Sequence, residues 1–384
     1  MIVLEGNIYL DNAATTFPKS EAVYKAMDDA NRRFAVNAGR GSYKLAREAN
    51  AIIDDTKERL LRLVSASSTS KVVFTPSITI SLNMILQGIT WQKGDIVYVS
   101  PYEHNAVART LEKVKNDFQI VVKLMPLTEK FDIHLPLLES LFITDRPKCV
   151  CCTGVSNVTG YILPTKEIFK AAKECGAITI LDSAQSLGII EQKLDDIDFL
   201  AFAGHKTLYG PFGIGGFIDN SGVKLKRVIV GGTGSNSLIL SMPEETPNRY
   251  ESSSPNIVAI AGLNAALEEL DVNHNFEFEK ELTEYSIEKL EEISNIRIYK
   301  SEKMDSQIGI ISFNIRNSGL SADDIGNILD EEFGIAVRTG YHCAPYIHNL
   351  LGDIEYNGTV RIGLGKFNTR EHIDALCDAL ENIV

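Results

Sequence analysis

The sequence of 384 residues contains little of what marks a membrane or secreted protein. No apolar run reaches the roughly 18 residues that a membrane-spanning helix needs. Residues 1–10 are apolar, but they have no basic start or small-residue cleavage site and they include Glu5, so they predict a strand rather than a signal peptide. The six cysteines do not show the spacing of a disulfide framework. We therefore expect a cytoplasmic protein.

Basic stretches are also missing. The chain has 38 basic and 51 acidic residues, a formal net charge of −13, and no Lys/Arg-rich run offsets this balance. An acidic surface of this kind disfavours nonspecific binding to nucleic acid. The sequence has no Walker motif, Gly-x4-Gly-Lys-Ser/Thr, which weighs against a nucleoside triphosphatase. The content of hydrophobic (44%) and charged (23%) residues is that of a globular protein, and the length suggests two domains.

Short β-rich runs alternate with helical patterns in the first two thirds of the sequence. The runs are apolar throughout, which is typical of strands buried on both faces. They cover residues 72–74, 96–99, 120–124, 149–153, 178–181, 199–202 and 214–218, and helices are expected over 20–34, 42–64, 83–89, 103–118 and 165–175. This alternation predicts an α/β fold with a mainly parallel, seven-stranded sheet.

The pattern changes after about residue 256. A helical segment over 257–293, a strand over 308–315, a helix start of capping-box type at Ser321, a strand over 359–364 and a helix over 369–383 predict a smaller α+β domain. We therefore predict a large domain over residues 1–256 and a small C-terminal domain over 257–384, with residues 1 to about 18 packing on the small domain. A cofactor usually binds between two such domains.

Cys343 stands apart from the other cysteines. It lies between His342 and Ala344, with Arg338 close in sequence. A thiol reacts as its thiolate, and neighbouring positive charge or imidazole lowers its pKa. A loop cysteine is more often without a role, however, and Arg338 is equally suited to a surface ion pair. The motif alone does not decide the function.

The remaining cysteines fit structural positions. Cys149, Cys151 and Cys152 share one apolar segment, and a strand would send alternate side chains to opposite faces. We favour a core strand over a metal site there, and we expect no metal. Cys175 and Cys377 fall in helical patterns and are expected to be core thiols.

Two polar residues follow predicted buried strands. Asp182 ends one strand, where open α/β sheets bind ligands; it either caps the next helix or pairs with a pyridinium nitrogen. Lys206 follows the next strand and is either a surface residue or an amine that forms a Schiff base with an aldehyde cofactor. His104, by itself, reads as a surface histidine. Together with Cys343, these side chains are what a pyridoxal phosphate (PLP) enzyme acting on a sulfur amino acid would need.

In this order, the motifs resemble those of the cysteine desulfurases, in the class V aminotransferase group of the fold-type I PLP superfamily. The resemblance extends from residues 9–16, Tyr-Leu-Asp-Asn-Ala-Ala-Thr-Thr, to residues 361–365, Arg-Ile-Gly-Leu-Gly. The cysteine motif is similar to the branch with Arg-x-Gly-x-His-Cys. The resemblance implies a fold-type I PLP-dependent transferase that forms a homodimer.

The resemblance also implies roles for individual residues. Lys206 would hold the cofactor covalently, Asp182 would pair with its pyridine nitrogen, and His104 would stack on its ring and shuttle protons. Arg361 would clamp the substrate carboxylate, where a planar bidentate donor is apt, and Cys343 would carry sulfur. The other implied contacts are Gln185 at the phenolic oxygen, Asn157 near the cofactor and the substrate carboxylate, Thr79 and His205 at the phosphate, and Ser254 at the phosphate of the neighbouring subunit.

The sequence departs from the family pattern at the predicted phosphate site. Ser77-Ile-Thr79 stands where Gly-Thr-Thr is usual, Ala203 replaces a serine, and Thr207 is an extra residue after Lys206. The glycine-rich segment 231–237 either restores contacts through backbone N–H groups, Thr233 and Ser235, or is a plain loop. Four histidines have no motif context and receive no role: His134, His274, His348 and His372.

The implied reaction converts L-cysteine to L-alanine, with the sulfur passing to Cys343 as a persulfide and then to an acceptor protein or small thiol. The acceptor, and whether the sulfur serves iron–sulfur cluster assembly, tRNA thiolation or a cofactor, stay open. Alternatives are a lyase acting on L-selenocysteine, another C–S lyase and a class V aminotransferase, although a transaminase does not need Cys343. A non-catalytic partner in a sulfur-transfer assembly is a further alternative. The presence of all four proposed functional residues argues against it: Lys206, Asp182, His104 and Cys343.

Overall fold

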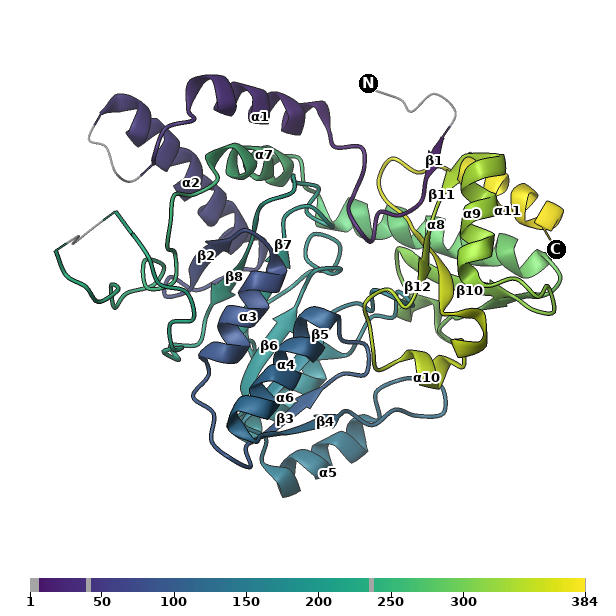
Figure 1. The fold of residues 1–384 in the computed structure, drawn as a ribbon, viewed down its shortest axis with the longest axis horizontal. Helices are drawn as coiled ribbons and strands as arrows, with labels where there is room; N and C mark the ends of the chain where they lie inside the picture. The colour runs from purple at the N-terminus through teal and green to yellow at the C-terminus, as the bar shows by residue number, and fades with distance from the viewer. Residues whose placement is uncertain (1–6, 39–42, 235–237, 384) are drawn as a thin grey trace.

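The computed structural model describes residues 7–38, 43–234 and 238–383 of the chain. Figure 1 shows two separate groups of strands, a large sheet flanked by helices and a smaller sheet that carries the C-terminal helices. The predicted strand over residues 1–10 is described only from residue 7 on, where β1 covers Ile8–Tyr9.

The large sheet has seven strands in the order β2-β8-β7-β6-β5-β3-β4. Neighbouring strands pair in parallel except at β8, which runs antiparallel to both β2 and β7. The strands are β2 (Lys71–Thr75), β3 (Ile96–Val99), β4 (Val121–Leu124), β5 (Cys149–Thr153), β6 (Ile178–Asp182), β7 (Phe199–Ala203) and β8 (Gly215–Asp219). The predicted α/β fold with a mainly parallel, seven-stranded sheet is therefore confirmed.

Helices cover both faces of this sheet and bury its apolar strands (Figure 1). They are α1 (Glu21–Arg33), α2 (Lys44–Leu63), α3 (Ile78–Gly88), α4 (Asn105–Phe118), α5 (Leu135–Asp145), α6 (Thr165–Glu174) and α7 (Ile257–Glu268). Strand β5 illustrates the two-sided burial, because Cys149 and Cys151 pack with α3 and α4 whereas Cys152 faces the core beneath α5 and α6. The prediction of a core strand at these cysteines is confirmed.

The small sheet has the order β12-β13-β10-β9, with neighbours antiparallel. Its elements are α8 (Val272–Glu292), β9 (Ile296–Ile298), a 3₁₀ turn (Met304–Ser306), β10 (Ile310–Ile315), α9 (Ala322–Phe333), β11 (Ile335–Ala336), β12 (Arg338–Gly340), α10 (His348–Leu351), a 3₁₀ turn (Ile354–Tyr356), β13 (Thr359–Gly363) and α11 (Arg370–Ile383). Helix α9 starts at the predicted capping box, in which the side chains and backbone N–H groups of Ser321 and Asp324 bond reciprocally. Strand β1 pairs in parallel with β11, and Leu10 lies in the core of this small sheet.

Two predicted helices differ clearly in extent from the structure, and two helices, α5 and the short α10, were not predicted. Helix α3 begins at Ile78, five residues before the predicted start at 83, with Ser77 as its N-cap. The predicted helix over 257–293 is two helices, since Asp271 accepts a hydrogen bond from His274 N and caps a new start. Helix α5 was not predicted, and it carries a proline in its first turn, where proline is tolerated.

The domain boundary at residue 256 stays a prediction. Ala259, Ile260 and Leu263 of α7 lie in the core of the large sheet, whereas Leu282 and Ile287 of α8 lie in the core of the small sheet. On this packing we propose that the boundary falls between α7 and α8.

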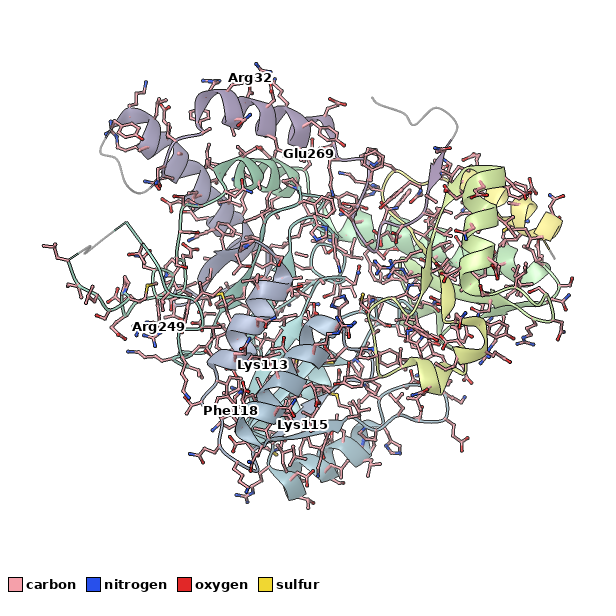
Figure 2. All side chains as sticks on the ribbon, viewed as in Figure 1. Arg32, Lys113, Lys115, Phe118, Arg249 and Glu269 are labelled. Carbon is pink, nitrogen blue, oxygen red and sulfur yellow. The ribbon has the colours of Figure 1, made fainter. Side chains whose placement is uncertain are left out.

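The surface carries many ion pairs within single helices. Arg32 on α1 and Lys113 and Lys115 on α4 point outward (Figure 2), and they pair with Asp28, Asp117 and Glu112 of the same helices. Exposed pairs of this kind contribute little to stability. In the described part of the chain, no helix has the length and apolar content that crossing a membrane requires.

Candidate active site

A cavity of about 210 Å³ opens at the carboxyl ends of β5, β6 and β7. Parallel strands present their carboxyl ends at one edge, and ligands of open α/β sheets bind there. The cavity lining includes eight of the ten residues singled out from the sequence: Thr79, His104, Asn157, Asp182, Gln185, His205, Lys206 and Arg361. Cys343 lies beside it, whereas Ser254 does not line it.

Asp182 and Lys206 line the cavity and influence each other through their opposite charges. Asp182 is 3% exposed and its Oδ1 accepts a hydrogen bond from Ala184 N at 3.0 Å. Burial raises the pKa of Asp182, and Lys206 opposes this shift. Burial lowers the pKa of Lys206 to about 8, while the Asp182 charge favours the ammonium form. A lysine tuned in this way has a substantial fraction of free amine near neutral pH, which is the nucleophilic form.

His104 caps the N-terminus of α4 and lines the cavity. Its Nδ1 accepts a hydrogen bond from Ala106 N at 3.0 Å, which leaves the proton of a neutral ring on Nε2. Burial, and then the nearby Lys206 charge, lower the pKa of His104 to about 4. The ring is therefore neutral at physiological pH and carries one exchangeable proton.

The N-terminus of α3 forms one wall of the cavity, with Ser77, Ile78 and Thr79 in its lining. A helix N-terminus presents free N–H groups and a partial positive charge, so it favours an anion. His205 lies in the same lining, and its buried Nδ1 has no hydrogen-bond partner among the described residues. This wall is suited to bind a phosphate group.

Arg361 lies at the opposite side, on β13 of the small sheet, and is 1% exposed. Its guanidinium donates to Asp11 Oδ1 at 2.7 Å and to the carbonyl of Asn157 at 2.8 Å. Its Nε is buried and has no partner among the described residues. Burial lowers the pKa of Arg361, and the Asp11 carboxylate opposes this effect. The group stays cationic and is available to a carboxylate in the cavity.

Cys343 sits in the turn that follows β12, half-buried beside the cavity. The Nη2 atom of Arg338 lies 3.6 Å from its Sγ, and Arg338 itself lines the cavity. Of the two roles considered for Arg338, the structure has the contact with the thiol, and no ion pair of Arg338 is found in the described part of the chain. The His342 ring bonds instead to Thr359, at 2.8 Å to the hydroxyl, and burial lowers its pKa well below the usual value.

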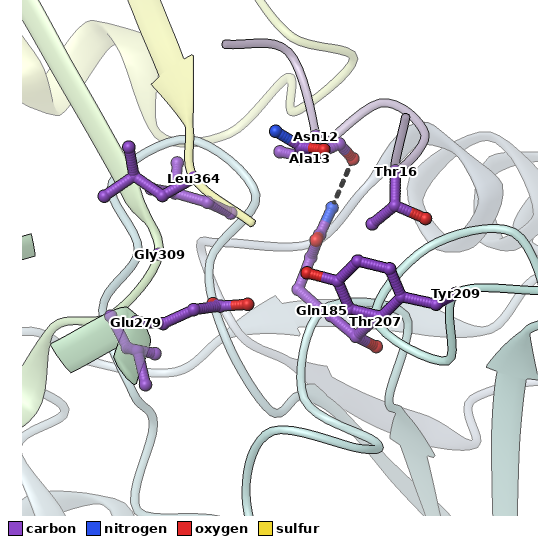
Figure 3. A pocket seen from close by; sticks show the side chains of 11 residues that line it. Asn12, Ala13, Thr16, Gln185, Thr207, Tyr209, Glu279, Gly309 and Leu364 are labelled. Atoms are coloured by element: carbon purple, nitrogen blue, oxygen red, sulfur yellow. Dashed lines mark hydrogen bonds between the residues drawn. The ribbon is translucent and has the colours of Figure 1, made fainter. Parts of the chain in front are cut away.

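A smaller cavity of about 20 Å³ lies behind Gln185 (Figure 3). Gln185 Nε2 donates to the carbonyl of Ala13 at 2.8 Å, which fixes the amide at the boundary of the two cavities. The carboxyl group of Glu279 points toward the hydroxyl group of Tyr209, and burial raises the pKa of Glu279 to about 8 despite their hydrogen bond. The Tyr209 hydroxyl also accepts from Lys366 N at 2.8 Å, so it joins the loop after Lys206 to the small sheet.

Ser254 and the glycine-rich segment 231–237 do not belong to the described lining of the cavity, and the phosphate contacts predicted for them stay predictions. Ser254 Oγ accepts a hydrogen bond from Asn37 at 3.2 Å. Residues 235–237 lie outside the described residues. The extra residue Thr207 is accommodated by a bond from its hydroxyl to the carbonyl of Leu187 at 2.6 Å. The role predicted for Ser254 stays a prediction.

Two residues of the site were missed by the sequence analysis. Asp11 pairs with Arg361 across 350 sequence positions, and Thr153 lines the cavity at the end of β5. The segment 9–16 was noted only for its resemblance, and its Asp-Asn pair was the available signal for Asp11. No comparable signal marked Thr153, because a threonine that ends a strand is common.

A sequence profile of the family described as Aminotransferase class-V matches residues 8–376. The chain belongs to the aminotransferase class-V family. Its relatives include a probable cysteine desulfurase of Halalkalibacterium halodurans, 32% identical over 97% of this chain and 92% of that protein. Another, of Methanothermobacter thermautotrophicus, is 30% identical over 99% of this chain and 96% of that protein.

Solved structures of class-V proteins have the same fold. The apo structure of a cysteine desulfurase from Thermococcus onnurineus NA1 has a TM-score of 0.89 at 28% identity, over 99% of this chain and 95% of that one. An Escherichia coli cysteine desulfurase in an S-sulfonic acid form has a TM-score of 0.84 at 28% identity, over the same shares. These neighbours confirm the predicted fold-type I architecture.

Members of this cysteine desulfurase group depend on PLP, so the donor set can be compared with that cofactor. The cavity offers a lysine amine, a buried carboxylate, a helix N-terminus and an imidazole nitrogen without a hydrogen-bond partner among the described residues. These groups match an aldehyde, a pyridine nitrogen and a phosphate. No group of three or more His, Cys, Asp or Glu side chains suited to a metal ion occurs among the described residues.

Proposed function

We propose that this protein is a PLP-dependent cysteine desulfurase that converts L-cysteine to L-alanine and transfers the sulfur to Cys343. The observation that carries the proposal is one arrangement. Lys206, the buried Asp182 and the buried Arg361 line one cavity, and a thiol in contact with Arg338 adjoins it. The family and the names of the relatives support the same reaction.

Several residues are suited to hold PLP in the cavity. Lys206 would bind it covalently, Asp182 would pair with the ring nitrogen, and Gln185 would face the phenolic oxygen. Thr79, His205 and the N-terminus of α3 would bind the phosphate. When bound, PLP supplies an aldehyde that combines with amines and a ring that accepts electron density.

The protein groups then have separate tasks. Arg361 binds the substrate carboxylate, with Asn157 beside it, and so fixes the amino acid between the large and small sheets. Lys206, as a free amine, takes and returns the proton at the α-carbon, and the neutral His104 ring carries an exchangeable proton beside it.

Cys343 performs the sulfur transfer. Its thiolate, next to the Arg338 guanidinium, attacks the substrate sulfur and forms an S–S bond while the carbon–sulfur bond of the substrate breaks. The electron pair stays with the carbon skeleton, which takes up a proton and leaves as L-alanine. A thiol of an acceptor then attacks the outer sulfur of the Cys343 persulfide and restores the Cys343 thiol. An aminotransferase has no use for this thiol, which favours desulfuration.

We also propose a homodimer with the cofactor near the subunit interface. Three apolar residues on the loop that joins β8 to α7 are strongly exposed in the single chain: the accessible areas of Val230, Leu238 and Leu240 are 67%, 99% and 103% of the reference value for a fully exposed residue. Closed twofold dimers are the commonest oligomers and would cover such a loop. Sedimentation at micromolar concentration with PLP bound should give a dimer, and a monomer would contradict this proposal. We further expect a cytoplasmic location and no binding of nucleic acid.

Product analysis tests the reaction. The purified protein with PLP should release L-alanine from L-cysteine, and mass spectrometry after one turnover should find one added sulfur on the Cys343 peptide. The same assay with L-selenocysteine distinguishes a lyase specific for selenium, which would release alanine from that substrate alone. Borohydride reduction should attach the cofactor to the Lys206 peptide, and a label on another lysine would overturn that assignment.

A further inference from the structure

The turn that carries Cys343 has a strained backbone. Ala344 N donates to the carbonyl of Tyr341 at 3.0 Å, and φ is positive at both central residues, 45° at His342 and 58° at Cys343. Two consecutive positive φ angles are typical of a type I′ turn, where glycine, asparagine and aspartate are preferred. Residues with larger side chains hold such angles only where the surrounding structure fixes them.

Each carbonyl of this turn accepts a hydrogen bond from a separate element. The carbonyl of Cys343 accepts from Asn105 N at 2.6 Å. The carbonyl of His342 accepts from Asn157 Nδ2 at 2.7 Å. The carbonyl of Tyr341 contacts His348 Nε2 at 2.8 Å. Asn157 lines the cavity, and Asn105 is next in sequence to His104, which also lines it. His348 is not part of the cavity lining. It approaches the turn from α10, on the side of the small sheet.

His348 is held in place by a buried carboxylate. His348 is 3% exposed and Asp353 is fully buried, and Nδ1 lies 2.6 Å from Asp353 Oδ2. Both ring nitrogens therefore face acceptors, a carboxylate oxygen and the Tyr341 carbonyl. A backbone carbonyl can only accept, so the ring presents an N–H to Tyr341 at Nε2.

The segment that carries this pair is itself anchored. The carbonyl of Asp353 accepts hydrogen bonds from Tyr356 N at 3.0 Å and Gly358 N at 3.1 Å. Arg297 of β9 donates to the carbonyl of Leu351 at 2.6 Å and to that of Gly352 at 3.2 Å. These hydrogen bonds fix the position of the backbone that carries Asp353, and so also the position of the His348 ring.

The pair is not what stability alone would select. Burying an imidazole and a carboxylate costs desolvation, and well-packed apolar side chains often serve as well or better. Asp353 Oδ1 is buried without a hydrogen-bond partner in the described part of the chain, which adds to that cost. An apolar side chain at position 348 would fill the space but would not donate to the Tyr341 carbonyl. What the His348–Asp353 pair adds is a fixed hydrogen-bond donor to the Tyr341 carbonyl, which restrains the backbone of the turn.

We propose that His348, oriented by Asp353, is a positioning residue that holds the Tyr341 carbonyl and so keeps the Cys343 turn in its strained conformation with Sγ beside Arg338. The catalytic consequence rests on the proposed function, because Cys343 must be the sulfur carrier for its position to set the rate. The restraint of the turn itself does not depend on that function.

Three variants separate the two hydrogen bonds of His348. In His348→Gln the amide nitrogen reaches toward the position of Nε2 and keeps a donor for Tyr341. In His348→Asn the shorter amide stays near Nδ1 and loses that donor. Asp353→Asn keeps a polar partner for the ring but removes the charge. His134→Asn is the matched control, since His134 caps α5 through Nδ1, away from the cavity, and asparagine is a good N-cap.

The turnover rate should depend on whether the side chain at position 348 still donates a hydrogen bond to the Tyr341 carbonyl. We expect kcat for L-cysteine to fall about tenfold or more in His348→Asn, to fall less in His348→Gln, and to stay at the wild-type value in His134→Asn. KM should change less than about twofold, because Arg361 and Asn157 are unchanged. A kcat that is unaltered in His348→Asn, or that is equally low in the asparagine and glutamine variants, overturns the proposal.

Alkylation of Cys343 by iodoacetamide, quantified on its peptide, tests the turn without any turnover. Measured at about pH 10, where a thiol is ionised with or without a neighbouring guanidinium, the rate should rise about threefold or more in His348→Asn and in Asp353→Asn, because a released turn exposes the half-buried thiol. The absorbance of bound PLP should not change. Wild-type alkylation rates in the folded variants, or loss of PLP together with activity, overturn the proposal. A wild-type protein that releases no alanine from L-cysteine refutes the proposed function instead, and the alkylation comparison then still decides whether His348 holds the turn.

Discussion

The two halves of the candidate active site are built by different means. Asp182 and Lys206 follow neighbouring strands, β6 and β7, whose backbones pair in register up to Asp182 and Ala201. The Cys343 turn lies outside any such ladder and is fixed by single hydrogen bonds from Asn105, Asn157 and His348. The cofactor side therefore inherits its geometry from the sheet. The thiol side depends on individual donors, so single substitutions should affect it more specifically.

Electrostatics also differ between the two halves. On the cofactor side, burial is the largest cause of the shifted pKa values of Lys206, His104 and Asp182. On the thiol side, the half-buried sulfur is in direct contact with the Arg338 guanidinium, whose Nη2 lies at 3.6 Å, and Lys206 and Arg361 act on it from farther away. Substitutions on the cofactor side and substitutions on the thiol side should therefore change different measured properties of the enzyme.

The largest effect is expected from Cys343→Ala. Removal of the nucleophile should lower desulfuration of L-cysteine on the order of 10³-fold or more, to a trace rate. The cofactor side is untouched, so PLP binding and its absorbance change on addition of L-cysteine should persist. Activity with L-selenocysteine should partly survive, because selenium is the better leaving group. Alanine release and persulfide mass spectrometry measure this, and a variant as fast as wild type would show that the two halves do not cooperate in this reaction.

Asp182→Asn tests the other half. A neutral amide cannot hold a proton on the ring nitrogen, and this should cost on the order of 10² in kcat. The Cys343 turn does not contact Asp182, so its rate of alkylation by iodoacetamide should equal that of the wild type. Steady-state kinetics and peptide mapping check both statements, and near-normal turnover would count against the ion pair with the cofactor.

Arg361→Lys addresses the residue that connects the halves. A lysine retains the charge but not the two-pronged contact with Asp11 and the Asn157 carbonyl. We expect KM for L-cysteine to rise roughly 10- to 100-fold, the range for loss of one charge-assisted hydrogen bond, with a smaller change in kcat. Initial rates over a range of cysteine concentrations measure the split. A change in kcat alone would contradict a role in binding the carboxylate.

The last effect is on stability rather than on activity and concerns Glu103. This fully buried carboxyl accepts hydrogen bonds from Ser100 Oγ and Thr153 N, and burial raises its pKa to about 8. The folded state then keeps a proton that the unfolded chain releases above its lower, ordinary pKa. Stability from this group is complete below that ordinary value and declines as pH rises toward about 8.

Glu103→Gln should remove that decline. Relative to wild type, the variant should gain roughly a few kcal/mol in free energy of unfolding between about pH 5 and about pH 8.5. Urea unfolding at both pH values measures the difference, with a wild-type protein at the same PLP saturation as reference. An equal pH dependence of the two proteins would show that Glu103 is already ionised in the folded state.

The same contrast explains which features could be predicted from the sequence. Continuous apolar runs located the strands of the large sheet, and the residues after them, Asp182 and Lys206, were found as strand-end residues. Helix α5 was missed because its apolar side chains surround the helix and include exposed Leu137 and Ile143, so no amphipathic period marks it. The late prediction of α3 has a similar cause, since Ile78 and Ile80 read as β-formers.

The hydrogen bonds that hold the Cys343 turn could not be predicted. Asn105 and Asn157 are distant in sequence from the turn, and a local pattern does not contain long-range partners. His348 follows Cys343 by only a few residues, but without the fold nothing indicated which way its ring pointed. Eight of the ten residues predicted from the sequence therefore line one cavity, whereas the restraints on the thiol came from the structure alone.

The pairing of Asp11 with Arg361 also has a consequence for biosynthesis. The two residues are 350 positions apart, and Asn12 likewise bonds to the carbonyl of Gly363. At typical translation rates of about 5–20 residues per second, Arg361 is synthesised roughly 20–70 s after Asp11. Strands β3 to β7 can be synthesised and pair during that time, before Arg361, the residue proposed to bind the substrate carboxylate, is made. A ribosome-bound chain would therefore hold an incomplete cavity, and the proposed catalysis would begin only after Arg361 has emerged from the ribosome.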